Sequence, residues 1–84
     1  MLERGTVVRS SAGRDKGKLL AIVGSEPKKV LVCDGKERPV DRPKSKNIRH
    51  VESVGYSLDE SETATNRALK KAIARLNAEI NGNT

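Results

Sequence analysis

The first segment that could do chemistry is a glycine-rich turn that carries three cations. It lies between a β-branched run at residues 6–8 and an apolar run that starts at residue 19. Glycine tolerates backbone conformations that other residues avoid and lets another backbone come close, while lysine and arginine neutralise phosphates. We therefore predict a hairpin whose tip binds a phosphate chain. Its candidate contacts are Arg9, Gly13, Arg14, Lys16, Gly17 and Lys18.

A second basic segment, residues 36–50, holds six basic and two acidic side chains. Pro39 and Pro43 prevent a helix and hold the backbone extended, so that neighbouring cations keep roughly the spacing of phosphates. Asn47 could bond a base edge or a ribose or could cap a turn, and His50 could stack on a base or make a structural hydrogen bond. The segment could also be a solvated loop. Its candidate nucleic-acid contacts are Arg38, Arg42, Lys44, Lys46, Asn47, Arg49 and His50.

Charge is distributed unevenly along a chain whose 84 residues predict one small domain. The first 50 residues hold 13 basic and 6 acidic side chains, whereas residues 51–84 hold 4 and 5. This asymmetry favours a polyanionic partner for the first part and a structural role for the second. A basic surface that serves only solubility is the alternative.

Aromatic content separates kinds of nucleic-acid binding. The chain has no Phe or Trp, and its one Tyr, Tyr56, lies outside both basic segments. Single-strand platforms stack bases on aromatic rings, and grooves for Pro-rich peptides or cages for methyl-lysine also need aromatics. Without these aromatics, the composition favours recognition of phosphates, ribose and shape, as in folded RNA.

Short strands at close spacing predict a small antiparallel barrel of about five strands. Residues 24–27 read as a loop, and Asp34-Gly35 is typical of a two-residue hairpin turn. The strands are expected near Gly5–Arg9, Lys18–Gly24, Lys29–Asp34, Arg38–Val40 and Asn47–Val51.

The last third of the chain predicts a helix over Glu62–Asn81, which contains no Pro or Gly. Either Ser57-x-x-Glu60 or Asp59-x-x-Glu62 could cap its start, and Gly82 could end it. One stripe is apolar, and the cations opposite it could form a solvated face or a second RNA contact. Because residues 19–23 and 30–33 are apolar throughout, one face of these strands can fill the barrel while the other receives the helix. The stripe is Leu69, Ala72, Ile73, Leu76 and Ile80, and the cations are Arg67, Lys70, Lys71 and Arg75.

The run Gly13-Arg14-Asp15-Lys16-Gly17-Lys18 between two apolar strands resembles the KOW motif of RNA-binding and ribosome-associated proteins. Residues 32–39 and 43–50 are similar to small bacterial KOW-domain RNA-binding proteins, which themselves resemble archaeal and eukaryotic-type KOW ribosomal proteins of the large subunit. The resemblance covers about residues 5–51. It implies an SH3-like barrel, which we place over residues 1–55. The helix pattern described above adds residues 56–84 as a helical extension packed on the barrel within one structural domain.

Other classes of function find little support in the residues. One His and one Cys stand seventeen positions apart, without a nucleophile motif, phosphate-loop signature or metal-ligand cluster, so we expect no enzyme, no metal and no cofactor. Cys33 reads as a buried, reduced thiol. No apolar run approaches the length of a membrane span and no secretory signal is visible, which favours a cytoplasmic protein without a membrane partner.

These observations lead us to expect a monomeric protein that binds structured RNA, above all ribosomal RNA, with ribosomal or transcription proteins as further partners. Two alternatives stay open. One is a protein-interaction adaptor of the transcription and translation machinery, like the KOW domain of NusG-type elongation factors. The other is an architectural protein of duplex DNA; such proteins usually expose apolar wedges, and apart from Met1 and Leu2 the sequence shows no evident one.

Overall fold

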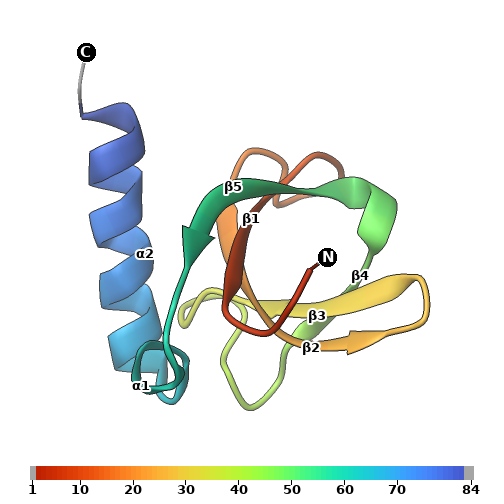
Figure 1. The fold of residues 1–84 in the computed structure, drawn as a ribbon, viewed down its shortest axis with the longest axis horizontal. Helices are drawn as coiled ribbons and strands as arrows, with labels where there is room; N and C mark the ends of the chain where they lie inside the picture. The colour runs from red at the N-terminus through yellow and green to blue at the C-terminus, as the bar shows by residue number, and fades with distance from the viewer. Residues whose placement is uncertain (1, 83–84) are drawn as a thin grey trace.

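The fold is a curled antiparallel sheet with a long helix beside it, in a computed structural model that describes residues 2–82 (Figure 1). The sheet order is β4-β3-β2-β1-β5, and the short helix η1 joins the two edge strands. The predicted mainly β fold, a small five-stranded barrel with a C-terminal helix, is confirmed. The elements are β1 (Thr6–Ser10), β2 (Leu19–Glu26), β3 (Lys29–Cys33), β4 (Lys44–Asn47), η1 (Ile48–His50), β5 (Val51–Ser57), α1 (Glu60–Thr63) and α2 (Asn66–Asn81).

Strand β2 is buried on both faces, as its unbroken apolar run predicts. Leu20 and Ile22 face the barrel interior, whereas Leu19 and Ala21 alternate with them and face α2. The interior cluster also contains Val8, Val30, Val32 and Val51, and the cluster under the helix contains Val7, Cys33, Leu58, Leu69, Ala72, Ile73 and Leu76. The helix therefore covers the outer face of the sheet.

The connection between β2 and β3 is tighter than the sequence indicated. β2 continues through residues 24–26, which the sequence assigned to a loop, and Glu26 pairs with Lys29 across a two-residue turn. Pro27 fits the first corner of that turn, and Lys28 has φ of 70°, the positive value that the second corner of a type II turn requires.

The connection between β3 and β4 is wider than predicted. The Asp34 carboxylate accepts hydrogen bonds from the backbone N–H groups of Lys36 and Arg38, each at 2.9 Å, and so opens the turn into a loop over residues 34–43. The two-residue hairpin and the strand expected at residues 38–40 are both wrong. The strand expected at residues 47–51 is also wrong, because η1 occupies residues 48–50 there and separates β4 from β5.

The predicted helix is divided into two. Asp59 and Glu62 form a complete capping box at the start of α1, which confirms one of the two proposed caps. Thr65 then takes an extended conformation and accepts a hydrogen bond from Ala68 N at 3.1 Å, so that α2 begins anew at residue 66. The expected stripe lies in the core, with Ile80 partly buried at its end, and α2 ends before Gly82.

Candidate nucleic-acid interface

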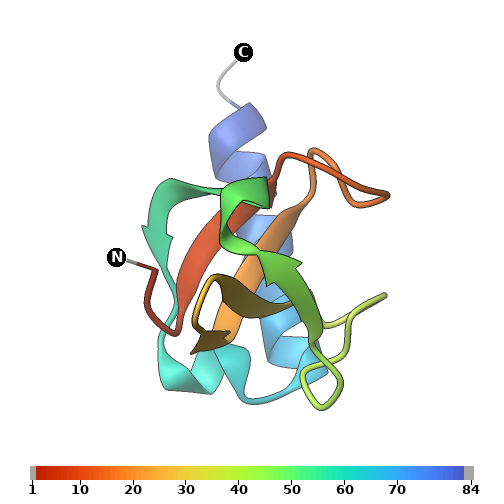
Figure 2. The same cartoon turned by 90° about the vertical axis from the view of Figure 1, so that its right-hand side faces the viewer.

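The two basic segments lie side by side. Backbone Ser11 N donates to His50 O at 2.9 Å, which ties the start of the β1–β2 turn to the end of η1. Lys18 Nζ contacts Glu37 Oε1 at 2.9 Å and links the same turn to the β3–β4 loop. The turn and the loop project from the same side of the barrel (Figure 2). We call the turn (residues 11–18), the loop (residues 34–43), β4 and η1 together the basic face.

The glycine-rich turn has a fixed backbone. Gly13 and Gly17 have φ of 84° and 87°, a region that residues with a Cβ atom rarely adopt. Gly17 N donates to Ser10 O at 2.8 Å, and Arg9 Nη1 donates to Gly17 O at 2.8 Å. Arg9 therefore braces the turn, and its guanidinium is partly engaged within the protein.

Lys46 is the main correction to the set of candidate contacts. Its side chain is only 6% exposed, and Nζ donates to Asp15 Oδ1 and to Ala12 O, both at 2.9 Å. Lys46 pairs with Val30 across the sheet, and side chains directly opposite in an antiparallel pair share a face. Since Val30 faces the barrel interior, Lys46 faces it too. Lys46 thus holds the turn to β4 and is not available to a phosphate.

Asp15 completes this buried ion pair. Its Oδ1 also lies 2.9 Å from Ser10 Oγ, while Oδ2 is buried without a partner among the described residues. Burial opposes ionisation, but the hydrogen bonds from Lys46 and Ser10 and the charges of Lys46 and Lys44 outweigh it, so the pKa of Asp15 lies below its ordinary value. The carboxylate is therefore ionised at neutral pH.

A small cavity of about 150 Å³ opens between the turn and the loop. Three of the candidate cations line it, but three carboxylates line it as well, so it offers no excess of positive charge. The ion pair with Glu37 raises the pKa of Lys18 and lowers that of Glu37, and both side chains remain exposed. The lining consists of Arg14, Asp15, Lys18, Leu20, Asp34, Glu37 and Arg38.

The remaining candidates are accessible. Asn47 Oδ1 accepts a hydrogen bond from Arg49 N at 2.9 Å, so Asn47 caps η1, one of its two expected roles. His50 is exposed. Within residues 2–82 no hydrogen bond or ion pair engages the side chains of Arg14, Lys16, Arg38, Arg42, Lys44 or Arg49; Lys44 and Arg38 are half-buried and the others exposed.

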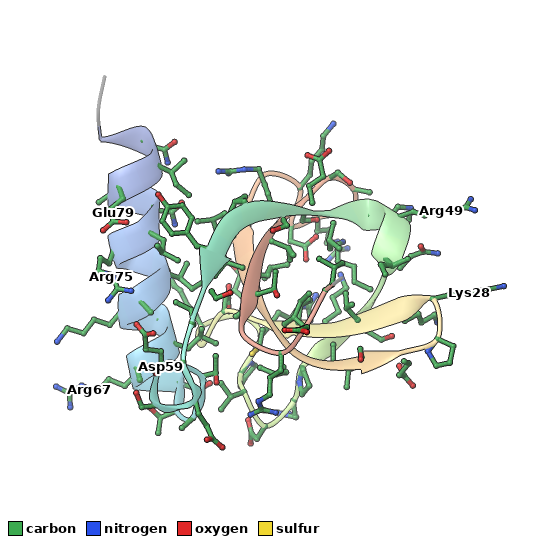
Figure 3. The ribbon with its side chains drawn as sticks, viewed as in Figure 1. Lys28, Arg49, Asp59, Arg67, Arg75 and Glu79 are labelled. Carbon is green, nitrogen blue, oxygen red and sulfur yellow. The ribbon has the colours of Figure 1, made fainter. Side chains whose placement is uncertain are left out.

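Lys28 is a cation that the sequence analysis missed. The two-residue turn brings it next to η1, where Ile48 N donates to Lys28 O at 3.1 Å. Lys28 and Arg49 both project from the end of the barrel that lies away from α2 (Figure 3). The signal that could have found it is Pro27, which favours a tight turn between two apolar strands.

The cations of α2 lie elsewhere. Arg67, Lys70, Lys71 and Arg75 are all exposed, and Arg75 Nη2 contacts Glu62 Oε2 at 3.0 Å. Arg67 projects away from the barrel (Figure 3). Val40 N of the loop donates to Asn66 Oδ1 at 2.7 Å, and Gly35 lies against the backbone of Asn66 and Lys70, so the start of α2 borders the basic face while Arg67 points away from it.

No protein-family model matches the chain, and no curated protein matches it. The likeness to KOW proteins therefore rests on the residues quoted above. Among residues 2–82 there is no group of three or more His, Cys, Asp and Glu side chains placed to hold a metal ion. No helix in this part of the chain is long and apolar enough to cross a membrane.

Proposed function

We propose that this protein binds structured RNA, with ribosomal RNA as the partner that the KOW resemblance favours, and that it is not an enzyme. One observation carries the proposal: the buried contact between Lys46 and Asp15 joins two basic segments that are 31 residues apart in the chain. In these two segments the side chains of Arg14, Lys16, Arg42, Lys44 and Arg49 have no hydrogen-bond or ion-pair partner among residues 2–82.

Binding of this kind gains affinity when the cations lie on a surface that is formed before the ligand arrives. The positive-φ glycines, the Arg9 brace and the ion pair of Lys46 hold the turn in one conformation, which lowers the entropy lost on binding. Each exposed lysine or arginine can neutralise a phosphate and release counterions. Because the single aromatic residue, Tyr56, is on β5, recognition through shape and phosphates is favoured over stacking of a single strand.

Competition binding tests the preference for structured RNA. A folded hairpin should compete better than an unstructured oligonucleotide of equal length, and equal affinity would count against recognition of shape. With roughly 4–7 phosphate contacts, log K plotted against log salt should have a slope between about −3 and −6. A slope near zero would mean that the cations bind no phosphates and that the basic charge serves solubility. A duplex DNA that binds as tightly as the RNA hairpin would favour the architectural role.

Charge-matched variants locate the surface. Arg14→Ala with Lys16→Ala removes two charges from the basic face, and Arg67→Ala with Lys71→Ala removes two from α2. The first pair should make the salt slope shallower by about two, whereas the second should leave it unchanged. All four side chains are exposed, so neither pair should alter thermal melting by much. The opposite result would place the RNA on the helix.

Sedimentation of a lysate through a sucrose gradient tests the partner. Co-migration with ribosomal particles that ribonuclease abolishes supports ribosomal RNA. Co-migration with RNA polymerase that survives ribonuclease would favour the adaptor role instead.

A further inference from the structure

A hollow lies at the end of the barrel, between the β2–β3 turn and η1. Its volume is about 450 Å³, and it is lined by Lys28, Asn47, Ile48 and Arg49. Ile48 is 42% exposed although its side chain is large and apolar. Tyr56, at 38%, is the other large hydrophobic side chain exposed to this degree in residues 2–82. Burial of an isoleucine side chain is favourable, so its exposure beside two cations indicates a candidate contact with a ligand.

The backbone around the hollow holds Ile48 in place. Ile48 N donates to the carbonyl oxygen of Lys28 at 3.1 Å, which fixes η1 against the turn. Asn47 uses its Oδ1 to accept from Arg49 N at 2.9 Å, which leaves the side-chain amide N–H groups free to donate outward. The apolar side chain is therefore presented by a formed turn and lines the same hollow as two long cations.

The charges around the hollow are of one sign. Two cations and no carboxylate line it, in contrast to the cavity beside Asp34 and Glu37. An anionic ligand is thus favoured. The apolar part is a single side chain, far smaller than the surface that a stable protein partner buries. A ligand that combines one apolar facet with flanking anions fits both features, and a nucleotide is such a ligand.

We propose that this hollow receives one unpaired nucleotide of the bound RNA. Ile48 contacts the face of the base or its ribose, Asn47 donates a hydrogen bond to a base edge or a hydroxyl, and Lys28 and Arg49 bind the phosphates on either side. Apolar side chains such as isoleucine serve nucleic-acid binders as wedges against unstacked bases. The inference rests on the proposed RNA binding and adds to it a preference for RNA stems that carry a bulged nucleotide.

Two hairpins that share one stem sequence and one terminal loop test the inference, one with a fully paired stem and one whose stem carries a single bulged 2-aminopurine nucleotide, so that only the bulge distinguishes them. The wild-type protein should bind the bulged hairpin more tightly and change the 2-aminopurine fluorescence. Ile48→Ala should weaken binding to the bulged hairpin by roughly fivefold to thirtyfold, since it removes apolar carbons from the contact. The affinity for the paired hairpin and the slope of log K against log salt should stay unchanged. Lys28→Ala should make the slope shallower by about one.

Tyr56→Ala is the matched control, because it removes an equally exposed hydrophobic side chain outside the basic face and should change neither hairpin. Ile48→Thr keeps the branched shape and serves as a second variant if Ile48→Ala melts early. If both Ile48 variants still bind RNA in a salt-dependent way and still prefer the bulged hairpin as the wild type does, the nucleotide site is overturned and the proposed RNA binding stands. Wild-type protein that binds neither hairpin in a salt-dependent way would overturn the proposed RNA binding itself.

Discussion

Replacing Lys46 by methionine should damage the fold more than it damages RNA binding. The lysine side chain is 6% exposed and that of Asp15 is 10% exposed, so the pair lies inside the protein. Without Nζ, Asp15 Oδ1 and Ala12 O both depend on the one hydroxyl hydrogen of Ser10, whose Oγ lies 2.9 Å from each, and Asp15 Oδ2 stays unpaired. Breaking a buried pair by removing one partner costs about 3–5 kcal/mol.

That cost is large for a chain of this size. Domains have a free energy of unfolding of about 0.05–0.15 kcal/mol per residue, which for 84 residues is about 4–13 kcal/mol. Lys46→Met should therefore remove a large share of the stability, and in the lower part of that range it would leave the chain partly unfolded. Replacing both partners by apolar residues is often close to neutral. The double variant Asp15→Leu with Lys46→Met should consequently be destabilised by far less than the two single changes added together.

Urea unfolding followed by far-ultraviolet circular dichroism measures these differences. Lys16→Ala, an exposed lysine in the same turn, is the control and should change the free energy of unfolding by less than about 0.5 kcal/mol. The reasoning is refuted if Lys46→Met costs less than about 1 kcal/mol and makes the salt slope of RNA binding shallower. Lys46 would then be a solvated cation that meets a phosphate.

Three further predictions concern stability and reactivity. Because the folded-state pKa of Asp15 is lowered, its ion pair should contribute fully above about pH 4 and lose its contribution as the pH falls through that lower pKa; acid titration should therefore destabilise the wild type relative to Asp15→Leu with Lys46→Met. Leu76→Ala should cost about 2–4 kcal/mol in urea unfolding because Leu76 is buried between α2 and the sheet, whereas Arg75→Ala, whose ion pair is exposed, should cost less than about 1 kcal/mol. The Cys33 side chain is fully buried, and burial raises the pKa of its thiol to about 11, so a thiol reagent at pH 8 should react at least about a hundredfold more slowly with the folded protein than with the unfolded chain; equal rates would mean that the thiol is accessible.

The sequence was sufficient where a pattern is local and redundant. The apolar run at residues 19–23 predicts a strand with two buried faces, and the stripe on α2 predicts which face of the helix packs on it; both are confirmed. At Gly17 the sequence indicates a residue that tolerates strained backbone, and the structure has a φ of 87° there. In these cases neighbouring residues all favour the same conformation.

The sequence was insufficient where one side chain decides between alternatives. The Asp34 carboxylate captures two backbone N–H groups and turns an expected hairpin into a loop. Thr65 supplies a second N-cap and so divides a run of good helix formers. Composition and periodicity favour the regular element at both places, and hydrogen bonds from one polar side chain outweigh them.

The candidate site shows a different limit. Lys46 is one of six cations in its segment, and its neighbours in the chain do not distinguish it. Its burial depends on its pairing opposite Val30 in β3 and on Asp15, 31 residues earlier. The register between β3 and β4 was unknown because the loop between them was mispredicted. Charge alone therefore identified the basic segments, but it could not distinguish Lys46, which is buried and holds the turn to β4, from the cations that remain accessible to phosphate.

An NMR titration of the isotope-labelled full chain with an RNA hairpin tests the central claim most directly, because backbone amide signals report both binding and its location. We predict that the amides of Gly13, Gly17 and Arg49 shift together in a salt-dependent way, while those of Arg67 and Lys71 on the outer side of α2 stay in place. Shifts confined to α2 would contradict an RNA interface on the basic face. The absence of any shift at an RNA concentration that saturates the protein in the binding assay would contradict it as well.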